Sequence, residues 1–159
     1  MQLLVIRHAR AAEANGGSDS QRPLTDLGRS EFEAAASKIA NSGSVPQHIY
    51  HSPARRTTET AEILASCLGL AISAREMVPW LTLGSGCDDI LPMLNELPAE
   101  VTAIVGHEPA MSALASAFVG GGWFKFLPGT VACIEFETLV IPGTGQLLWM
   151  LDPQPASSQ

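Results

Sequence analysis

Side chains that suit phosphoryl chemistry stand just after short apolar runs or in the turn that follows one: Arg7, His8, Arg56 and His107. Guanidinium forks match the oxygens of a phosphate group and keep their charge at physiological pH. A neutral imidazole nitrogen can attack phosphorus and form a covalent phosphohistidine. These residue types predict a pocket for a phosphate-bearing substrate, with His8 as its nucleophile.

The charges of this pocket also bear on the protonation of His8. Arg7 and Arg56 disfavour another positive charge nearby, so we expect the pKa of His8 to be lowered and its ring to be neutral near pH 7. The same arginines would neutralise the phosphoryl oxygens in the transition state, and His107 would add a donor. One histidine after a strand is more often structural, but four matching side chains favour catalysis.

The composition narrows the classes of partner. The 159 residues include 9 basic and 16 acidic side chains, a formal charge of −7, and 46% are hydrophobic. A globular protein with this acidic balance repels polyanions, which argues against binding to nucleic acid or to an acidic membrane. An anion must therefore be bound locally, by a few positive groups.

Neither a membrane span nor a metal centre is expected. The longest apolar run is far shorter than the roughly 20 residues that cross a bilayer. Three widely spaced cysteines fit neither a disulfide framework nor a zinc module: Cys67, Cys87 and Cys133. His48 and His51 would lie on opposite faces of a strand, which argues against a shared metal. We expect a protein of the reducing cytoplasm.

Alternating apolar and amphipathic segments predict an α/β fold. Strands are expected at 2–6, 48–51, 70–78, 101–105, 130–137 and 146–151, and helices at 25–41, 53–68, 88–97 and 109–119. The sheet should be mostly parallel and covered by helices on both faces, with an antiparallel edge formed by the last two strands. Residues 1–152 would form a single domain, and 153–159 a frayed tail.

The predicted topology brings the polar residues to one place. Ligands of such folds bind beyond the carboxyl ends of the parallel strands. The turns expected at that edge are 7–9, 52–56 and 106–109, and they contain all four side chains named above. Helix N-termini in the second and third turns would add backbone donors for an anion.

Several motifs resemble the histidine phosphatase superfamily in order and spacing, and the resemblance covers most of the chain. They are the run from Leu4 to Ala9, the loop Arg22-Pro23-Leu24-Thr25 with Gly28, the turn Ser52-Pro53 with Arg56 and Thr60, and Val105-Gly106-His107. The short chain, the loop segment Ser18-Asp19-Ser20 and the lack of an inserted helical cap look most like the SixA-type phosphohistidine phosphatases of that superfamily.

The resemblance implies a phosphoglycerate mutase-like three-layer α/β/α sandwich and an enzyme that needs no metal or cofactor. It implies a covalent phosphohistidine at His8, with the phosphate held by Arg7, Arg56 and His107. The implied substrate is a phosphohistidine on a partner protein, such as a histidine-containing phosphotransfer domain. Arg22 would line the entrance where the substrate binds, and a monomer is the expected state.

The sequence departs from the family pattern at two positions. Ala9 stands where the family usually has a glycine, which raises the question of whether this turn needs a positive φ. Trp80, in Val78-Pro79-Trp80-Leu81, stands where many members have an acidic proton donor. The remaining candidates for the acid are Glu76, Asp88, Asp89 and Glu108.

A missing acid changes the expected substrate. An alkyl phosphate ester releases a strongly basic alkoxide and gains about 10²- to 10⁴-fold from a positioned acid. A phosphorylated imidazole can take its proton from solvent on the far ring nitrogen and leave as a neutral group. The sequence therefore favours N–P over O–P substrates. A small-molecule phosphomonoesterase and a non-catalytic phosphate-binding module are the alternatives.

Aromatic residues after the glycines at 120–122 admit two interpretations. Trp123, Phe124 and Phe126 could form a docking surface for a partner, or could pack against the sheet edge. Packing in the core is the expectation.

Overall fold

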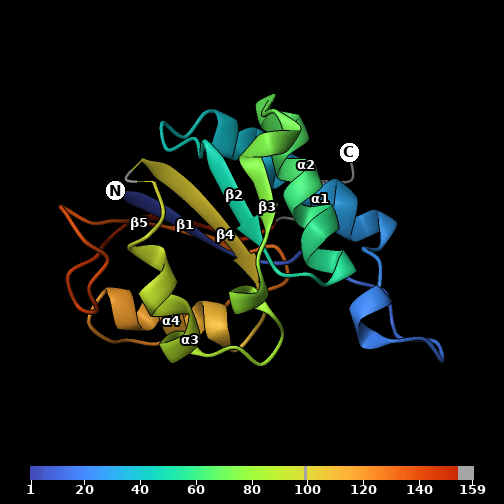
Figure 1. Ribbon diagram of the computed structural model, residues 1–159. Helices are drawn as coiled ribbons and strands as arrows, with labels where there is room; N and C mark the ends of the chain where they lie inside the picture. The colour runs from blue at the N-terminus through green and yellow to red at the C-terminus, as the bar shows by residue number, and fades with distance from the viewer. Residues whose placement is uncertain (99, 154–159) are drawn as a thin grey trace.

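A six-stranded mixed sheet forms the middle layer of the computed structural model, which describes residues 1–98 and 100–153 (Figure 1). Its strands are β1 (Gln2–Arg7), β2 (His48–His51), β3 (Arg75–Met77), β4 (Val101–Gly106), β5 (Val131–Glu135) and β6 (Gln146–Leu151). Their order across the sheet is β3-β2-β4-β1-β5-β6. The first four of these neighbours run parallel, while β5 and β6 are antiparallel additions at one side, as predicted.

Four helices cover the two faces of the sheet: α1 (Asp26–Ala40), α2 (Arg55–Leu68), α3 (Cys87–Leu94) and α4 (Ala110–Phe118). Helices α1 and α2 lie on one face, and α3 and α4 lie on the other (Figure 1). Strand β1 serves both layers, because Leu4 and Ile6 pack with α1 and α2 whereas Leu3 and Val5 pack with α3 and α4. The three-layer α/β/α sandwich is confirmed.

Some element boundaries differ from the prediction. The strand expected at 70–78 is only Arg75–Met77, and a 3₁₀ turn, Ile72–Ala74, precedes it. This strand lies at the sheet edge. Ile72, which precedes it, is 85% exposed, so this apolar residue does not indicate a buried strand. Helix α2 begins at Arg55 rather than at 53, because the hydroxyl of Ser52 already accepts the amide of Ala54 before the helix starts.

Helix α3 ends three residues before the predicted boundary at 97. The side chain of Asn95, directly after the helix, donates to the carbonyl of Val140 and accepts its amide. This tertiary pair fixes the chain where the periodic pattern alone would continue the helix.

The loop from 11 to 24 crosses the sheet edge and is tied down at its far end. The Thr25 hydroxyl accepts the amide of Gly28 at 2.9 Å and so caps α1. A Cβ on Gly28 would overlap the carbonyl oxygen of Arg10, so glycine lets the chain after β1 lie directly on the start of α1.

No helix among residues 1–98 and 100–153 has the length and apolar character needed to cross a membrane. The frayed tail expected at 153–159 lies outside the described residues from 154 onward.

Candidate active site

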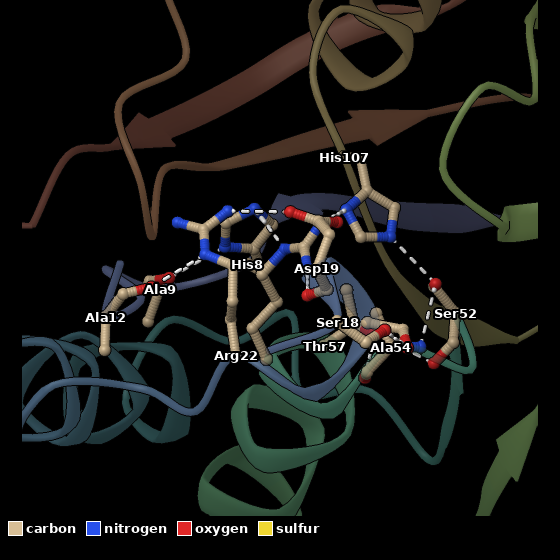
Figure 2. A network of polar contacts seen from close by, with 12 residues as sticks. His8, Ala9, Ala12, Ser18, Asp19, Arg22, Ser52, Ala54, Thr57 and His107 are labelled. Atoms are coloured by element: carbon tan, nitrogen blue, oxygen red, sulfur yellow. Dashed lines mark hydrogen bonds and ion pairs between the residues drawn. The ribbon is translucent and has the colours of Figure 1, made fainter. Parts of the chain in front are cut away.

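The carboxyl ends of β1, β2 and β4 meet at one edge of the sheet and are joined by backbone hydrogen bonds. The amide of His8, just beyond β1, donates to the carbonyl of Gly106 at 3.1 Å. The amide of Ser52, just beyond β2, donates to Val105 at 3.1 Å. The three turns therefore lie side by side, as the topology predicted, and their side chains form the network of polar contacts in Figure 2.

His8 is buried and held in a single tautomer. Its Nδ1 lies 2.7 Å from the carbonyl oxygen of Ala9, which can only accept, so Nδ1 carries the hydrogen. Its Nε2 lies 3.3 Å from Nε of Arg56, which can only donate, so Nε2 carries the lone pair. The Ala9 amide donates to Thr60 at 3.0 Å and ties this turn to α2. The lone pair of His8 thus faces the guanidinium of Arg56.

Burial is the largest cause of a low pKa at His8, which falls to about 3. The positive charge of Arg56, the ring of His107 and the charge of Arg7 lower it further, while the hydrogen bond to Ala9 opposes them. The sequence predicted the direction and the contribution of the arginines, but not the larger effect of burial. His8 is therefore a neutral base in the folded protein.

His107 follows β4 and completes the buried group. Its ring centroid lies 5.4 Å from that of His8. Its Nδ1 accepts from Nη2 of Arg56 at 3.4 Å, which leaves Nε2 to donate to the Ser52 hydroxyl at 2.8 Å. Burial and then the charge of Arg56 lower the pKa of His107 to about 4, against an opposing effect of Asp19. Its ring is neutral, and its hydrogen points to Ser52.

Arg56, in the first turn of α2, links both histidines to the loop from 11 to 24. Its side chain is only 3% exposed. Its Nη1 donates to the backbone carbonyl of Asp19 at 2.9 Å, and its Nη2 donates to Oδ2 of the same residue at 3.0 Å. An anion that binds Arg56 would therefore compete with Asp19 for this guanidinium.

Arg7 ends β1 beside this group. Its Nη1 donates to the carbonyl of Phe126 at 2.8 Å, and its buried Nε has no hydrogen-bond partner among the described residues. Burial lowers the pKa of Arg7, against the opposing charge of Glu108, and the charge of Arg7 in turn lowers the pKa of both His8 and His107. An unpaired buried guanidinium nitrogen is a donor available to an anion.

Arg22 is joined to the site through Asp19. Its Nε donates to the carbonyl of Ala12 at 2.7 Å, and its Nη1 contacts Oδ1 of Asp19 at 3.1 Å. The structure therefore brings Arg7, His8, Arg56 and His107 together and puts Arg22 one contact farther out. Their roles in catalysis and binding stay predictions.

Sequence reasoning missed Asp19 as a member of the site. Its carboxylate bridges Arg56 and Arg22, although Asp19 belongs to the loop from 11 to 24 and not to the turns at the strand ends. The Ser18-Asp19-Ser20 segment contributed to the family resemblance, and an acidic residue three positions before Arg22 was the available signal.

The two departures from the family pattern have structural explanations. No residue other than glycine has a positive φ among the described residues, so Ala9 fits its turn, where it is buried in the core. Trp80 lies in a 3₁₀ turn, Pro79–Leu81, and packs against Tyr50 with ring centroids 6.2 Å apart. An aromatic side chain thus occupies this position as a packing residue.

The four candidate acids lie away from the lone pair of His8 or are bound elsewhere. Asp89 accepts a hydrogen bond from the amide of Gly86 at the start of α3. Glu108 accepts hydrogen bonds from the amide and the hydroxyl of Ser112. Glu76 and Asp88 are exposed. Glu108 is the one whose charge acts on Arg7.

Two further expectations concern metals and aromatic residues. Among the described residues no group of three or more histidine, cysteine, aspartate or glutamate side chains could hold a metal ion. Phe126 is buried and Phe124 partly buried, as expected for core packing, whereas Trp123 is 85% exposed.

Comparisons with known proteins agree with this geometry. Residues 3–78 match the family model of the histidine phosphatase superfamily (branch 1). The chain is 30% identical to the phosphohistidine phosphatase SixA of Escherichia coli K12, over 96% of this chain and 94% of that protein. A solved structure of the protein histidine phosphatase SixA with tungstate superimposes with a TM-score of 0.79 at 27% identity, over 96% of this chain and 97% of that one.

A mycobacterial glucosyl-3-phosphoglycerate phosphatase, solved with VO₃, shares the fold at a TM-score of 0.67 and 18% identity, over 93% of this chain and 97% of that one. The sequence match to the E. coli protein covers nearly the whole of both chains. The chain therefore belongs to the histidine phosphatase superfamily, within its group of SixA-like phosphohistidine phosphatases, and it is a phosphatase.

Proposed function

We propose that this protein removes the phosphoryl group from a phosphohistidine on a partner protein and carries it transiently on His8. The observation that carries the proposal is the tautomer of His8, whose Nδ1 is bound to Ala9 and whose Nε2 lone pair faces Arg56. The named activity of the E. coli relative and the tungstate held by the solved SixA structure support it.

In the first step the Nε2 lone pair of His8 forms a bond to phosphorus. The bond between phosphorus and the substrate nitrogen breaks, and its electron pair stays on that nitrogen. A substrate ring that is protonated on its other nitrogen leaves as neutral imidazole. Arg56 and Arg7 would neutralise the phosphoryl oxygens, because both guanidiniums are fixed before the substrate arrives.

In the second step water attacks phosphorus on the opposite side from Nε2. The bond from phosphorus to Nε2 breaks, and its electron pair returns to the ring of His8. Both protons of the attacking water end on the product, so dihydrogen phosphate leaves and can lose one proton to solvent, while His8 returns to its starting tautomer. The low pKa of His8 keeps Nε2 free of a competing proton for the next cycle.

His107 would respond to the charge of the substrate. In the free protein Nε2 of His107 donates to the Ser52 hydroxyl, and Nδ1 accepts from Arg56. A phosphoryl dianion beside the ring favours its protonated form and so raises its pKa. His107 would then take up a proton and donate from Nδ1 to a phosphoryl oxygen.

We favour phosphohistidine over an alkyl ester because an aromatic residue stands where many members of the family have an acidic proton donor. Trp80 packs against Tyr50, and Glu108 is bound by Ser112. We retain the cytoplasm as the expected location and a monomer as the expected state.

Transfer of labelled phosphate tests the proposal. A protein bearing ³²P-phosphohistidine should transiently label this enzyme with an acid-labile phosphate and release inorganic phosphate. His8→Ala should abolish both, with a loss of at least about 10⁴-fold in turnover, as expected for removal of a nucleophile. His48→Ala, which changes a histidine on β2, is the matched control and should keep both activities.

Other results would favour the alternatives. Faster hydrolysis of a sugar phosphate than of phosphohistidine would identify a small-molecule phosphomonoesterase. Stoichiometric phosphate binding without labelling or hydrolysis would identify a non-catalytic module. Labelling that persists in His8→Ala would assign the nucleophile to another residue.

A further inference from the structure

A cavity of about 480 Å³ lies beside Arg56, whose guanidinium contacts both His8 and His107. Arg56 and Ser52, which are buried, form one part of its wall. Asp19 and Leu83, which are exposed, form another part. Because a phosphoryl group on its way to His8 would contact Arg56, the cavity next to Arg56 can hold the leaving part of the substrate.

Asp19 supplies the negative charge of this cavity. Among the described residues that line it, the ionisable ones are Asp19 and Arg56. The Asp19 carboxylate is fixed from two sides, with Oδ2 at 3.0 Å from Nη2 of Arg56 and Oδ1 at 3.1 Å from Nη1 of Arg22. A carboxylate has about four acceptor positions. Since the side chain is 52% exposed, positions beyond these two contacts remain accessible.

We propose that Asp19 selects nitrogen-linked phosphoryl groups by accepting a hydrogen bond from the far ring nitrogen of the leaving imidazole. This inference rests on the proposed function, because it concerns the leaving group of that reaction. A phosphorylated imidazole that leaves as a neutral ring carries a proton, and hence a positive charge, on its far nitrogen beforehand. A fixed carboxylate stabilises that charge and holds the ring with its N–H directed away from phosphorus.

A phosphate ester gains nothing from the same carboxylate. Its leaving oxygen has no N–H to donate, and an alkoxide needs a proton from the protein. The hydrogen bond from Arg22 and the charge of Arg56 hold the pKa of Asp19 below its ordinary value, so Asp19 has no proton to give near pH 7. The negative charge of Asp19 therefore favours nitrogen-linked phosphoryl groups over phosphate esters.

The Asp19→Asn variant tests the assignment with little change of shape. The backbone carbonyl that accepts from Nη1 of Arg56 is kept, and the amide oxygen can still accept from Nη2. Glu13→Gln is the matched control, because Glu13 is an exposed acidic residue of the same loop and also loses one negative charge. The probes are free phosphohistidine and p-nitrophenyl phosphate, whose phenolate leaves without a proton.

The expected result is a change in the ratio of two rates. Asp19→Asn should lower kcat/KM for phosphohistidine about tenfold relative to kcat/KM for p-nitrophenyl phosphate, as for a lost charge-assisted hydrogen bond. Glu13→Gln should leave both within about twofold. An equal fall for both substrates would mean that Asp19 only orients Arg56, and an equal rise would mean that it only competes with the phosphoryl group. Either result overturns the proposal.

The experiment also separates this inference from the function on which it rests. A wild-type enzyme that hydrolyses p-nitrophenyl phosphate but neither free phosphohistidine nor a phosphohistidine-bearing protein overturns both. A wild-type enzyme that prefers phosphohistidine, with the same preference in Asp19→Asn, overturns only the role of Asp19.

Discussion

The residues at the strand ends and the loops around them are held in different ways. We call Arg7, His8, Ser52, Arg56 and His107 the strand-end cluster, and the loops 11–24, 79–86 and 120–129 the rim loops. Four of these side chains, those of His8, Arg56, His107 and Ser52, are hydrogen-bonded in series. The backbone amides of His8 and Ser52 donate to β4. The rim loops reach the cluster through single residues, Asp19 on Arg56 and the carbonyl of Phe126 on Arg7.

The difference between the rigid cluster and the exposed rim loops suits two separate tasks, phosphoryl transfer and substrate selection. Phosphoryl transfer needs donors fixed before the substrate arrives, which buried and mutually bound side chains provide. Choice of substrate depends on groups that meet the leaving group and the partner protein, and exposed loops supply these without disturbing the core. We therefore expect the strand-end cluster to carry out the phosphoryl transfer and the rim loops to determine the choice of substrate.

The largest expected contrast is between two arginines that bind the same aspartate. Arg56→Ala should lower kcat/KM for phosphohistidine about 10³-fold, as for removal of a preorganised donor from the transition state. Arg22→Ala should lower it at most about tenfold, because Arg22 contacts the cluster only through Asp19. Steady-state kinetics on both variants measures the contrast. Equal losses would place Arg22 within the phosphate site and remove the distinction between cluster and rim.

The cluster should also make folding stability depend on pH. In the unfolded chain both imidazoles take up protons as the pH falls through about 6.5, whereas in the folded protein the pKa values are about 3 for His8 and about 4 for His107. The unfolded state therefore binds more protons, and stability is lost as the pH falls from about 6.5 toward 4. The expected loss at pH 5 is about 2 kcal/mol for each histidine.

Denaturant unfolding at pH 8 and pH 5 measures this loss. His8→Gln should reduce the difference in unfolding free energy between the two pH values by about 2 kcal/mol, because the suppressed protonation of His8 is gone. An unchanged difference in the variant would mean that His8 is already charged in the folded protein, which contradicts its role as a neutral nucleophile.

A rim loop becomes as sensitive as the cluster only where its backbone is in close contact with a helix. Gly28→Ala would put a Cβ against the Arg10 carbonyl and should cost about 1–3 kcal/mol of unfolding free energy, as for overpacking of a filled site. Ser30→Ala, on an exposed position of the same helix, is the control and should cost less than about 0.5 kcal/mol. A neutral Gly28→Ala would show that the backbone at Arg10, just before the loop from 11 to 24, shifts freely over α1.

The contrast between the strand-end cluster and the rim loops also explains which features could be predicted from the sequence. Apolar runs that end at polar residues located β1 and β4, and parallel topology then brought His8 and His107 to one edge, because the carboxyl ends of parallel strands meet. Each of these inferences depends on periodicity and on short-range order, which a single sequence records directly.

The rim was less predictable, because its contacts depend on how the loops fold over the edge. No periodic pattern links Asp19 to Arg56, which lies 37 positions along the chain. The orientation of the His107 ring could not be predicted either. Its Nε2 donates to Ser52, which the sequence identified only as part of a turn. The short strand β3 was overestimated because apolar residues such as Ile72 can remain exposed at a sheet edge.

The smallest expected effect concerns the rim residue that is most exposed. Trp123 is 85% exposed, so Trp123→Ser should change the unfolding free energy by no more than about 0.5 kcal/mol. Hydrolysis of free phosphohistidine should stay within about twofold of the wild type, because the strand-end cluster binds that substrate by its phosphoryl group. A destabilisation above about 1 kcal/mol would mean that this loop packs as the core does. A loss of activity confined to a phosphorylated protein substrate would instead assign Trp123 to partner docking and make the contrast between cluster and rim sharper.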